Sequence, residues 1–172
     1  MIRVVVYSAA DEVELRLNGT SMGRKPAGKE NRYTATFEIP YVPGVLEAVS
    51  WNGTEIASTA KISTTGKPSA IRLCSEPSTG SILRYVLVEI VDEQGNVVPN
   101  AELPLIASVE GGAVLAGFGS SKPVTAENYT SGNALSFNGR ALAIMRMNDE
   151  ASTATLNISS PGFEDALITC SI

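Results

Sequence analysis

The sequence predicts an all-β protein that consists of two consecutive antiparallel β-sandwiches. First, apolar and polar residues alternate with a period of two: Val13, Leu15 and Leu17 lie between charged neighbours. Segments with one packed and one solvated face are typical of antiparallel sheets. Second, the pairs Asn18-Gly19 and Asn52-Gly53 separate such segments, and these residues tolerate the positive φ of hairpin turns. Third, no stretch keeps the 3.6-residue period of a helix.

Short expected strands recur along the whole chain. Their spacing, with turn residues between them and no helical crossovers, is typical of immunoglobulin-like (Ig-like) sandwiches. The alternation is clearest in residues 13–17, 33–39 and 152–159. The full set of expected strands is 2–7, 13–17, 33–39, 45–51, 55–62, 70–74, 82–91, 104–109, 113–117, 140–147, 152–159 and 165–171.

A small, polar segment at residues 63–68 (STTGKP) divides the chain. A Pro- and Gly-containing stretch between two apolar strands marks a domain boundary, so we place two Ig-like domains at residues 1–65 and 66–172. A domain of about 65 residues has a thin core. We therefore expect the first domain to lean on a neighbour or to lack a strand upstream of Met1.

Charge and composition argue against several classes of protein. The net charge is −5 and the basic residues are scattered, whereas a nucleic-acid-binding protein gathers Lys and Arg on one face. No apolar run reaches the roughly 18 residues of a membrane helix. The first residues do not form a signal peptide, which neither supports nor excludes export of a parent protein. The chain has no histidine, which excludes Ser-His-Asp and Cys-His catalysis and most catalytic zinc sites.

The two cysteines, Cys74 and Cys170, are too few and too far apart for a zinc cluster. Each lies in an expected strand, and free packed thiols are the favoured interpretation. A disulfide stays open as the alternative if the first and last strands of the second domain pair. We expect no metal and no cofactor in this chain.

Paired carboxylates are the first candidates for chemistry, because glycoside hydrolysis needs two of them across the scissile bond. The pairs available are Glu12/Glu14 and Glu102/Glu110. Glu12 and Glu14 fall on the solvated face of an expected strand, so solubility explains them better than catalysis. We assign no catalytic residue.

Trp51 is the main candidate for contact with a sugar or a neighbouring domain. It ends a strand before a hairpin turn and has three interpretations, in order of preference: a packed side chain, a contact with a neighbouring domain, or an open platform on which a sugar stacks. Tyr33 shares a strand face with Phe37 and is expected in the core. One aromatic residue is a poor binding face by itself.

Two loops could hold a ligand, but each has a simpler interpretation. The longest connection, residues 117–137, is favoured as a surface loop held by its aromatic residues over a ligand site, although long ordered loops are often functional. The acidic stretch 92–96 lacks the ordered oxygen spacing of an EF-hand and is favoured as a plain turn over a calcium site.

The segments VYSAADEVELRLNGTSMG (Val6–Gly23) and PYVPGVLEAV (Pro40–Val49) carry a resemblance to a known family. They resemble the part of bacterial glycoside hydrolase family 2 β-galactosidases that follows the catalytic barrel, with mild departures at Ala9 and Met22, where the family usually has Asn and Leu. Residues 67–172 resemble the terminal Ig-like domain of the same enzymes, and Val86–Pro99 is also similar to invasin-type bacterial Ig-like modules.

The resemblance implies a non-catalytic accessory C-terminal fragment of a β-galactosidase, not an enzyme by itself. The family's catalytic glutamates lie in a (β/α)8 barrel of about 250 residues, which this chain is too short to contain. The implied partners are the barrel and other domains of the parent enzyme, and further candidates are carbohydrate and a homo-oligomer formed through the parent. Nucleic acid and membrane are not expected as partners, and a periplasmic or secreted parent is favoured over a cytoplasmic one. Two alternatives stay open: a stand-alone carbohydrate-binding module, and an adhesin-type Ig-like spacer.

Overall fold

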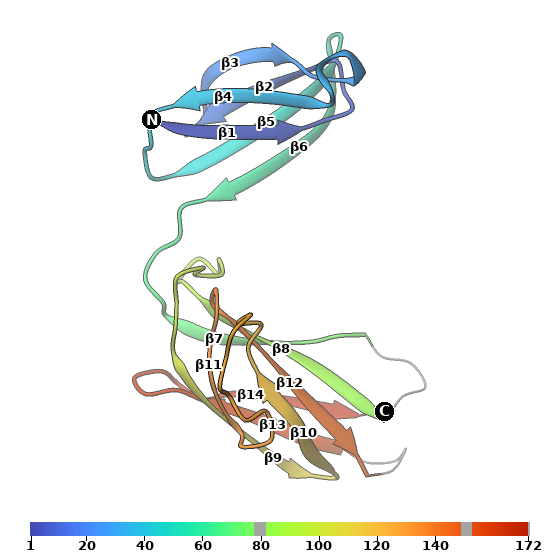
Figure 1. The fold of residues 1–172 in the computed structure, drawn as a ribbon, viewed down its shortest axis with the longest axis vertical. Helices are drawn as coiled ribbons and strands as arrows, with labels where there is room; N and C mark the ends of the chain where they lie inside the picture. Colours follow the sequence, from blue (N-terminus) through green and yellow to red (C-terminus); the bar gives the residue numbers. More distant parts are fainter. Residues whose placement is uncertain (78–81, 149–152, 172) are drawn as a thin grey trace. The chain divides into compact units, whose positions relative to one another are not determined.

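The computed structural model describes residues 1–77, 82–148 and 153–171. These residues form β-strands and one 3-10 turn, η1 (Lys29–Asn31), and none of their helical segments could cross a membrane. The predicted all-β, antiparallel sandwich fold is confirmed. The chain forms two compact units, which we call unit 1 (Met1–Thr64) and unit 2 (Thr65–Ile172). In Figure 1 unit 1 runs from blue to green and unit 2 from green to red.

Unit 1 is a sandwich of a two-stranded and a four-stranded antiparallel sheet (Figure 1). The small sheet pairs β1 (Ile2–Tyr7) with β4 (Thr34–Ile39), and the large sheet has the strand order β3-β2-β5-β6. The strands of the large sheet are β2 (Glu12–Leu17), β3 (Thr20–Pro26), β5 (Val45–Asn52) and β6 (Glu55–Ser63). The core lies between β2 and β4, where Val13 and Leu15 share one buried cluster with Ala35 and Phe37.

The hairpin between β2 and β3 follows directly from its residue types. Asn18 and Gly19 both adopt positive φ, 51° and 80°, as a two-residue type I′ turn requires. The Asn18 side chain then fixes the next corner, because its Oδ1 accepts a hydrogen bond from the Val45 N–H at 2.8 Å and its Nδ2 donates to the Pro43 carbonyl at 3.1 Å. A Cβ on Gly44 would collide with the Asn18 amide, so the corner requires glycine.

Unit 2 consists of two four-stranded antiparallel sheets with the orders β10-β12-β8-β7 and β11-β9-β13-β14. The strands are β7 (Ala70–Ser75), β8 (Leu83–Val91), β9 (Pro104–Gly111), β10 (Ala113–Gly119), β11 (Asn133–Leu135), β12 (Arg140–Met147), β13 (Thr153–Ser159) and β14 (Ala166–Ser171). Val88 of β8, Met145 of β12 and Leu156 of β13 are completely buried between the sheets. Both cysteines are free thiols, and Cys170 is buried in this core.

The structure differs from the sequence-based expectation in a few places. Strands β3 and β11 were not expected from the sequence, and the expected start of a strand at residue 152 lies outside the described residues. The expectation that Tyr33 lies in the core is wrong. Tyr33 precedes β4, its φ is 60° and its side chain is exposed, because the chain leaves the 3-10 turn in a left-handed conformation before the strand begins.

Candidate functional site

Glu12 and Glu14 lie on the outer face of β2, each next to an arginine. Arg16 donates a hydrogen bond to Glu14 Oε2 at 2.7 Å, and Arg24 forms an ion pair with Glu12 Oε2 at 2.8 Å. The hydrogen bond from Arg16 is the largest cause of a lowered pKa at Glu14. A general acid in glycoside hydrolysis needs a raised pKa instead, so this pair is suited to ion pairing and not to proton donation.

Glu102 and Glu110 are both exposed and stand far apart. Glu102 precedes β9 and Glu110 lies near the end of that strand. Eight residues of extended chain span about 25 Å. The two carboxylates of a glycosidase lie within about 10 Å of each other, so this pair cannot act across one glycosidic bond.

Trp51 lies on the outer face of the large sheet of unit 1, in register with Glu12 of β2 and Ile56 of β6. The Arg24 guanidinium stands 4.8 Å from the centre of its ring, in the range of a cation–π contact. Arg24 is also tied to the Gly53 carbonyl at 2.9 Å. One face of the indole is therefore covered within the chain. A role of Trp51 in sugar binding or domain contact stays a prediction.

The loop that joins β10 to β11 is held by one carboxylate and one aromatic ring. Glu127 accepts hydrogen bonds from the Leu135 N–H at 2.8 Å and from the Ser120 hydroxyl at 3.2 Å. Burial would raise the pKa of Glu127, but these hydrogen bonds lower it. The Tyr129 ring packs directly on Gly119, where a Cβ would collide with a ring carbon. Gly119, the last residue of β10, therefore provides space for the tyrosine of the loop.

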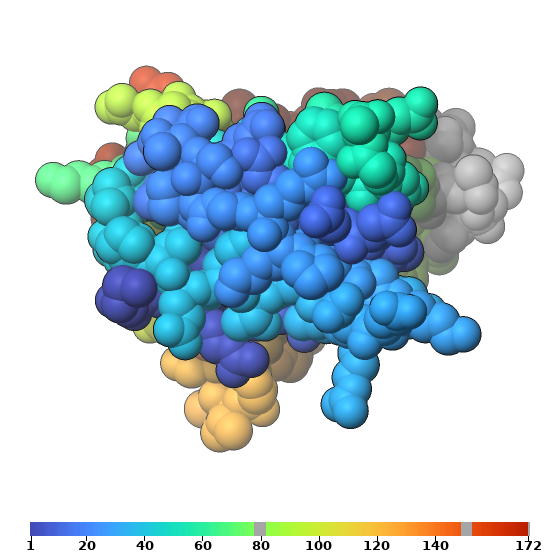
Figure 2. Space-filling model, turned by 90° about the horizontal axis from the view of Figure 1, so that it is seen from above, coloured from blue at the N-terminus to red at the C-terminus, as the bar shows by residue number. Residues whose placement is uncertain are grey.

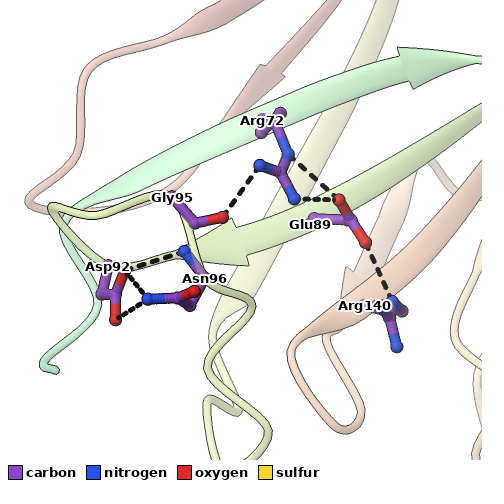
Figure 3. Close-up of polar contacts among 6 residues, drawn as sticks. All are labelled: Arg72, Glu89, Asp92, Gly95, Asn96 and Arg140. Carbon is purple, nitrogen blue, oxygen red and sulfur yellow. Dashed lines mark hydrogen bonds and ion pairs between the residues drawn. The ribbon is translucent and has the colours of Figure 1, made fainter. Parts of the chain in front are cut away.

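A charged network crosses three neighbouring strands of unit 2, as Figure 3 shows. Glu89 of β8 is in register with Arg72 of β7 on one side and Arg140 of β12 on the other. Arg72 donates to Glu89 Oε2 at 2.6 Å and 3.0 Å, and Arg140 donates to Oε1 at 3.0 Å. Desolvation is the largest effect and raises the pKa of Glu89, yet the two arginines outweigh it and leave the pKa lowered.

Asp92 organises the turn that follows β8 (Figure 3). Its carboxylate accepts hydrogen bonds from the Gly66 N–H at 2.8 Å, the Gln94 N–H at 3.0 Å and the Asn96 N–H at 2.8 Å. The bond from Gly66 is the largest cause of its lowered pKa. Backbone donors therefore use the oxygens that a cation would need, and the residues form a turn.

The core of unit 1 is covered on the side of β3 and uncovered on the side of β1 and β6. Most inward-facing side chains of β2 and β4 are almost fully buried: Val13, Leu15, Ala35, Phe37 and Ile39. On the edge strands the equivalent positions are uncovered: Ile2 of β1 is 38% exposed and Ile62 of β6 is 68% exposed. Figure 2 looks onto the opposite side, from above β3 in Figure 1, where the side chains form a continuous surface.

A cavity of about 100 Å³ lies on the side of β1 and β6, and we call it the edge groove. All but one of its lining residues are apolar, and they come from β1, β2, β5 and β6: Val4, Val6, Leu15, Leu46, Ala48, Ala60, Lys61 and Ile62. The sequence predicted a thin first core, but it did not show that these residues line a groove. Alternation predicts which residues face inward, whereas the strand order decides which of them are covered.

Two parts of the chain match known protein families. Residues 77–169 match the family described as glycoside hydrolase family 2 C-terminal domain 5, and residues 1–57 match a domain of unknown function, DUF4982. The first match covers more than half of the chain. The chain belongs to the C-terminal domain family of glycoside hydrolase family 2, and the resemblance read from the sequence is confirmed.

Individual relatives are much longer enzymes. The chain is 31% identical over 166 residues to Beta-galactosidase BoGH2A of Bacteroides ovatus, which covers 94% of the chain and 19% of that protein. It is 28% identical over 172 residues to a Beta-glucuronidase of Formosa agariphila, of which it covers 17%. The chain thus spans about a fifth of the length of these curated relatives.

Solved structures show the same relation. A glycosyl hydrolase family 2 member from Bacteroides cellulosilyticus superposes with a TM-score of 0.91 at 29% identity, over 98% of this chain and 24% of that one. A beta-glycosidase from Bacteroides vulgatus gives a TM-score of 0.87 at 25% identity, over 99% of this chain and 22% of that one.

Proposed function

We propose that this chain is the non-catalytic accessory C-terminal region of a family 2 β-galactosidase and that it packs against the catalytic barrel of its parent enzyme. The observation that carries the proposal is the match itself: nearly the whole chain aligns with about a fifth of a β-galactosidase. In this proposal the two Ig-like domains are residues 1–65 and 66–172. The barrel that holds the family's catalytic glutamates needs about 250 residues and alternating helices. In the described part of this chain the regular secondary structure consists of strands and one short 3-10 turn.

The state of the carboxylates supports a role without catalysis. Among the residues that the structure describes, the carboxyl groups with a shifted pKa are Glu14, Glu89, Asp92 and Glu127, and each of these pKa values is lowered. Every one of them accepts hydrogen bonds from arginine, hydroxyl, amide or backbone donors of the same unit. A retaining or inverting glycosidase needs one carboxyl group that stays protonated near neutral pH. Because their pKa values are lowered, these carboxyl groups stay ionised near neutral pH instead.

The edge groove favours docking over independent sugar binding. Its lining is apolar apart from Lys61, which suits a protein surface, whereas sugar sites combine a free aromatic face with polar groups. The aromatic candidate Trp51 is covered on one face by Arg24. In this proposal the choice between galactoside and glucuronide, which differs between the named relatives, belongs to the catalytic barrel.

The test compares the parent enzyme with a version that ends just before residue 1. The truncated enzyme and the 172-residue protein are also made separately and mixed, and their association is measured by size-exclusion chromatography. We expect the pieces to associate, and we expect the truncated enzyme to have a lower Tm than the complete one. An unrelated Ig-like domain of similar size serves as the control. Full stability and activity of the truncated enzyme, with no association, would refute the proposal.

A further inference from the structure

We infer that the edge groove of unit 1 receives one additional β-strand, and that the segment preceding this region in the parent enzyme provides it. The inference rests on the proposed function for the source of the strand. The shape of the groove and the free edges of β1 and β6, which indicate a missing strand, do not depend on the proposed function. The added strand would pair with the free edge of β1 and place its apolar side chains over the groove, next to β6.

Both strands that border the groove have a free edge. Within residues 1–77, 82–148 and 153–171, β1 pairs only with β4, and β6 is the last strand of its sheet, beyond β5. Figure 1 shows β1 and β6 as the outer strands of their sheets. A free edge carries a row of unpaired N–H and C=O groups, which is a template for a further strand.

Two of the edge strands of unit 1, β3 and β1, differ in how they are protected. Strand β3, at the covered side, carries Arg24, Lys25 and Pro26 and has only one partly buried residue. Charged residues and proline are the usual protection of a solvent-exposed edge. Strand β1 reads IRVVVY, an apolar edge with a single charge. The residue types of β3 are therefore typical of an edge strand that stays in solvent, whereas those of β1 are typical of an edge strand that another segment covers.

The side chains of the groove define the strand that fits. Inward-facing Val4 and Val6 of β1 are half-buried, and Ala60 and Ile62 across the groove are exposed. Residues of a strand alternate between the two faces of a sheet. A strand laid along β1 would thus need apolar residues at alternate positions to fill the groove and polar residues at the others.

The position of β1 in the chain favours the preceding segment as the source. β1 begins at Ile2, so a segment that precedes it needs only a short turn to run back along its free edge. Sequential strands are neighbours in most sheets. The relatives are about five to six times as long as this chain. The family is named for its C-terminal position, so we infer that most of their remaining length lies ahead of this region.

The test measures amide hydrogen exchange in β1 of three proteins: the 172-residue protein, the same protein extended by the roughly 20 residues encoded upstream, enough for a turn and a strand, and the parent enzyme. We expect the β1 amides that point away from β4 to exchange at least about tenfold more slowly in the two longer proteins, because they gain hydrogen-bond partners. Equal rates in all three proteins would overturn the inference, as would a gene that encodes nothing upstream of Met1.

A matched pair of substitutions on β6 adds a second readout. Ile62 faces the groove and is 68% exposed, and Ile56 lies on the opposite face, in register with Trp51, and is 57% exposed. In the 172-residue protein, Ile62→Asp and Ile56→Asp should have similarly small effects. In the extended protein, only Ile62→Asp should lower the folded-to-unfolded ratio, by about tenfold or more, because its side chain becomes buried. Equal effects of both variants in the extended protein would contradict the inference.

Two further outcomes separate this inference from the proposed function and from other occupants. If the parent needs this region for stability but its β1 exchanges as fast as in the 172-residue protein, the inference fails and the proposed function stands. If the extended protein is protected but the truncated enzyme never associates with this region, the proposed function fails alone. Self-association of the 172-residue protein that Ile62→Asp abolishes would assign the groove to a second copy and overturn our choice of occupant.

Discussion

Substitution of Glu89 by glutamine should destabilise unit 2 and leave unit 1 unchanged. Glu89 is 8% exposed and accepts three hydrogen bonds from Arg72 and Arg140. A hydrogen bond to a charged group contributes about 1.5–3 kcal/mol. Both arginines are roughly half exposed, 43% and 52%, so water replaces much of what they lose. We therefore expect a loss of about 1–2 kcal/mol for Glu89→Gln, well below the sum of three separate bonds.

The stability difference between the wild type and Glu89→Gln should depend on pH in a defined direction. The pKa of Glu89 is lowered in the folded protein from its ordinary value of 4.5. Its contribution is complete above that value and is lost as the pH falls through the lower folded pKa. The difference between the wild type and Glu89→Gln should therefore be largest near pH 7 and vanish at the acid end of the range in which unit 2 stays folded.

The assay uses the position of the single tryptophan. Trp51 is the only Trp of the chain and lies in unit 1, so its fluorescence follows unit 1, while far-UV circular dichroism follows both units. With a urea m-value of about 2 kcal/mol/M, in the middle of the usual range, the unit 2 midpoint should fall by roughly 0.5–1 M and the Trp51 transition should not move. Identical unit 2 midpoints at pH 7, or a difference that is the same at every pH, would refute the reasoning.

Three further substitutions test other parts of the structure. Leu15→Ala, at a buried position of the thin unit 1 core, should cost about 2–5 kcal/mol and lower the midpoint of the Trp51 fluorescence transition; an unchanged midpoint would contradict the assigned core. Gly119→Ala places a Cβ against the Tyr129 ring. It should lower the free energy of unfolding of unit 2 by about 1–3 kcal/mol and speed proteolysis in residues 120–132. Unchanged cleavage would argue against the packing of that ring. Asp92→Asn should lower unit 2 stability at pH 7 and reduce its loss on acidification, because the pKa of Asp92 is lowered mainly by the Gly66 N–H; equal acid titrations of both proteins would contradict this.

The strands that sequence reasoning found are those with one packed and one solvated face. In β2 and β4 the alternation follows the burial pattern closely, as Val13 and Phe37 illustrate. Strand β3 was missed because its sequence, TSMGRKP, has Met22 as its only large apolar residue. A strand at a solvent-exposed edge buries little, so it leaves little alternation to recognise.

The candidate site was less predictable because it depends on which strands are neighbours. The residue types of β6 do not show that Ile62 lies beside an uncovered groove. Its partner Leu46 in β5 has the same apolar character but is partly covered. The network around Glu89 likewise needs the register of three strands. The covering of Trp51 by Arg24 depends on the β2–β3 hairpin, which the sequence predicted only as a turn.

We propose that this chain has no hydrolytic activity of its own and serves an enzyme whose catalytic part lies elsewhere. The most direct measurement is the turnover of aryl β-galactoside and aryl β-glucuronide by the purified 172-residue protein, with Glu12→Gln and Glu14→Gln variants measured alongside. We expect a rate equal to the buffer blank for all three proteins. Turnover that co-purifies with the wild-type chain and disappears in either variant would contradict it.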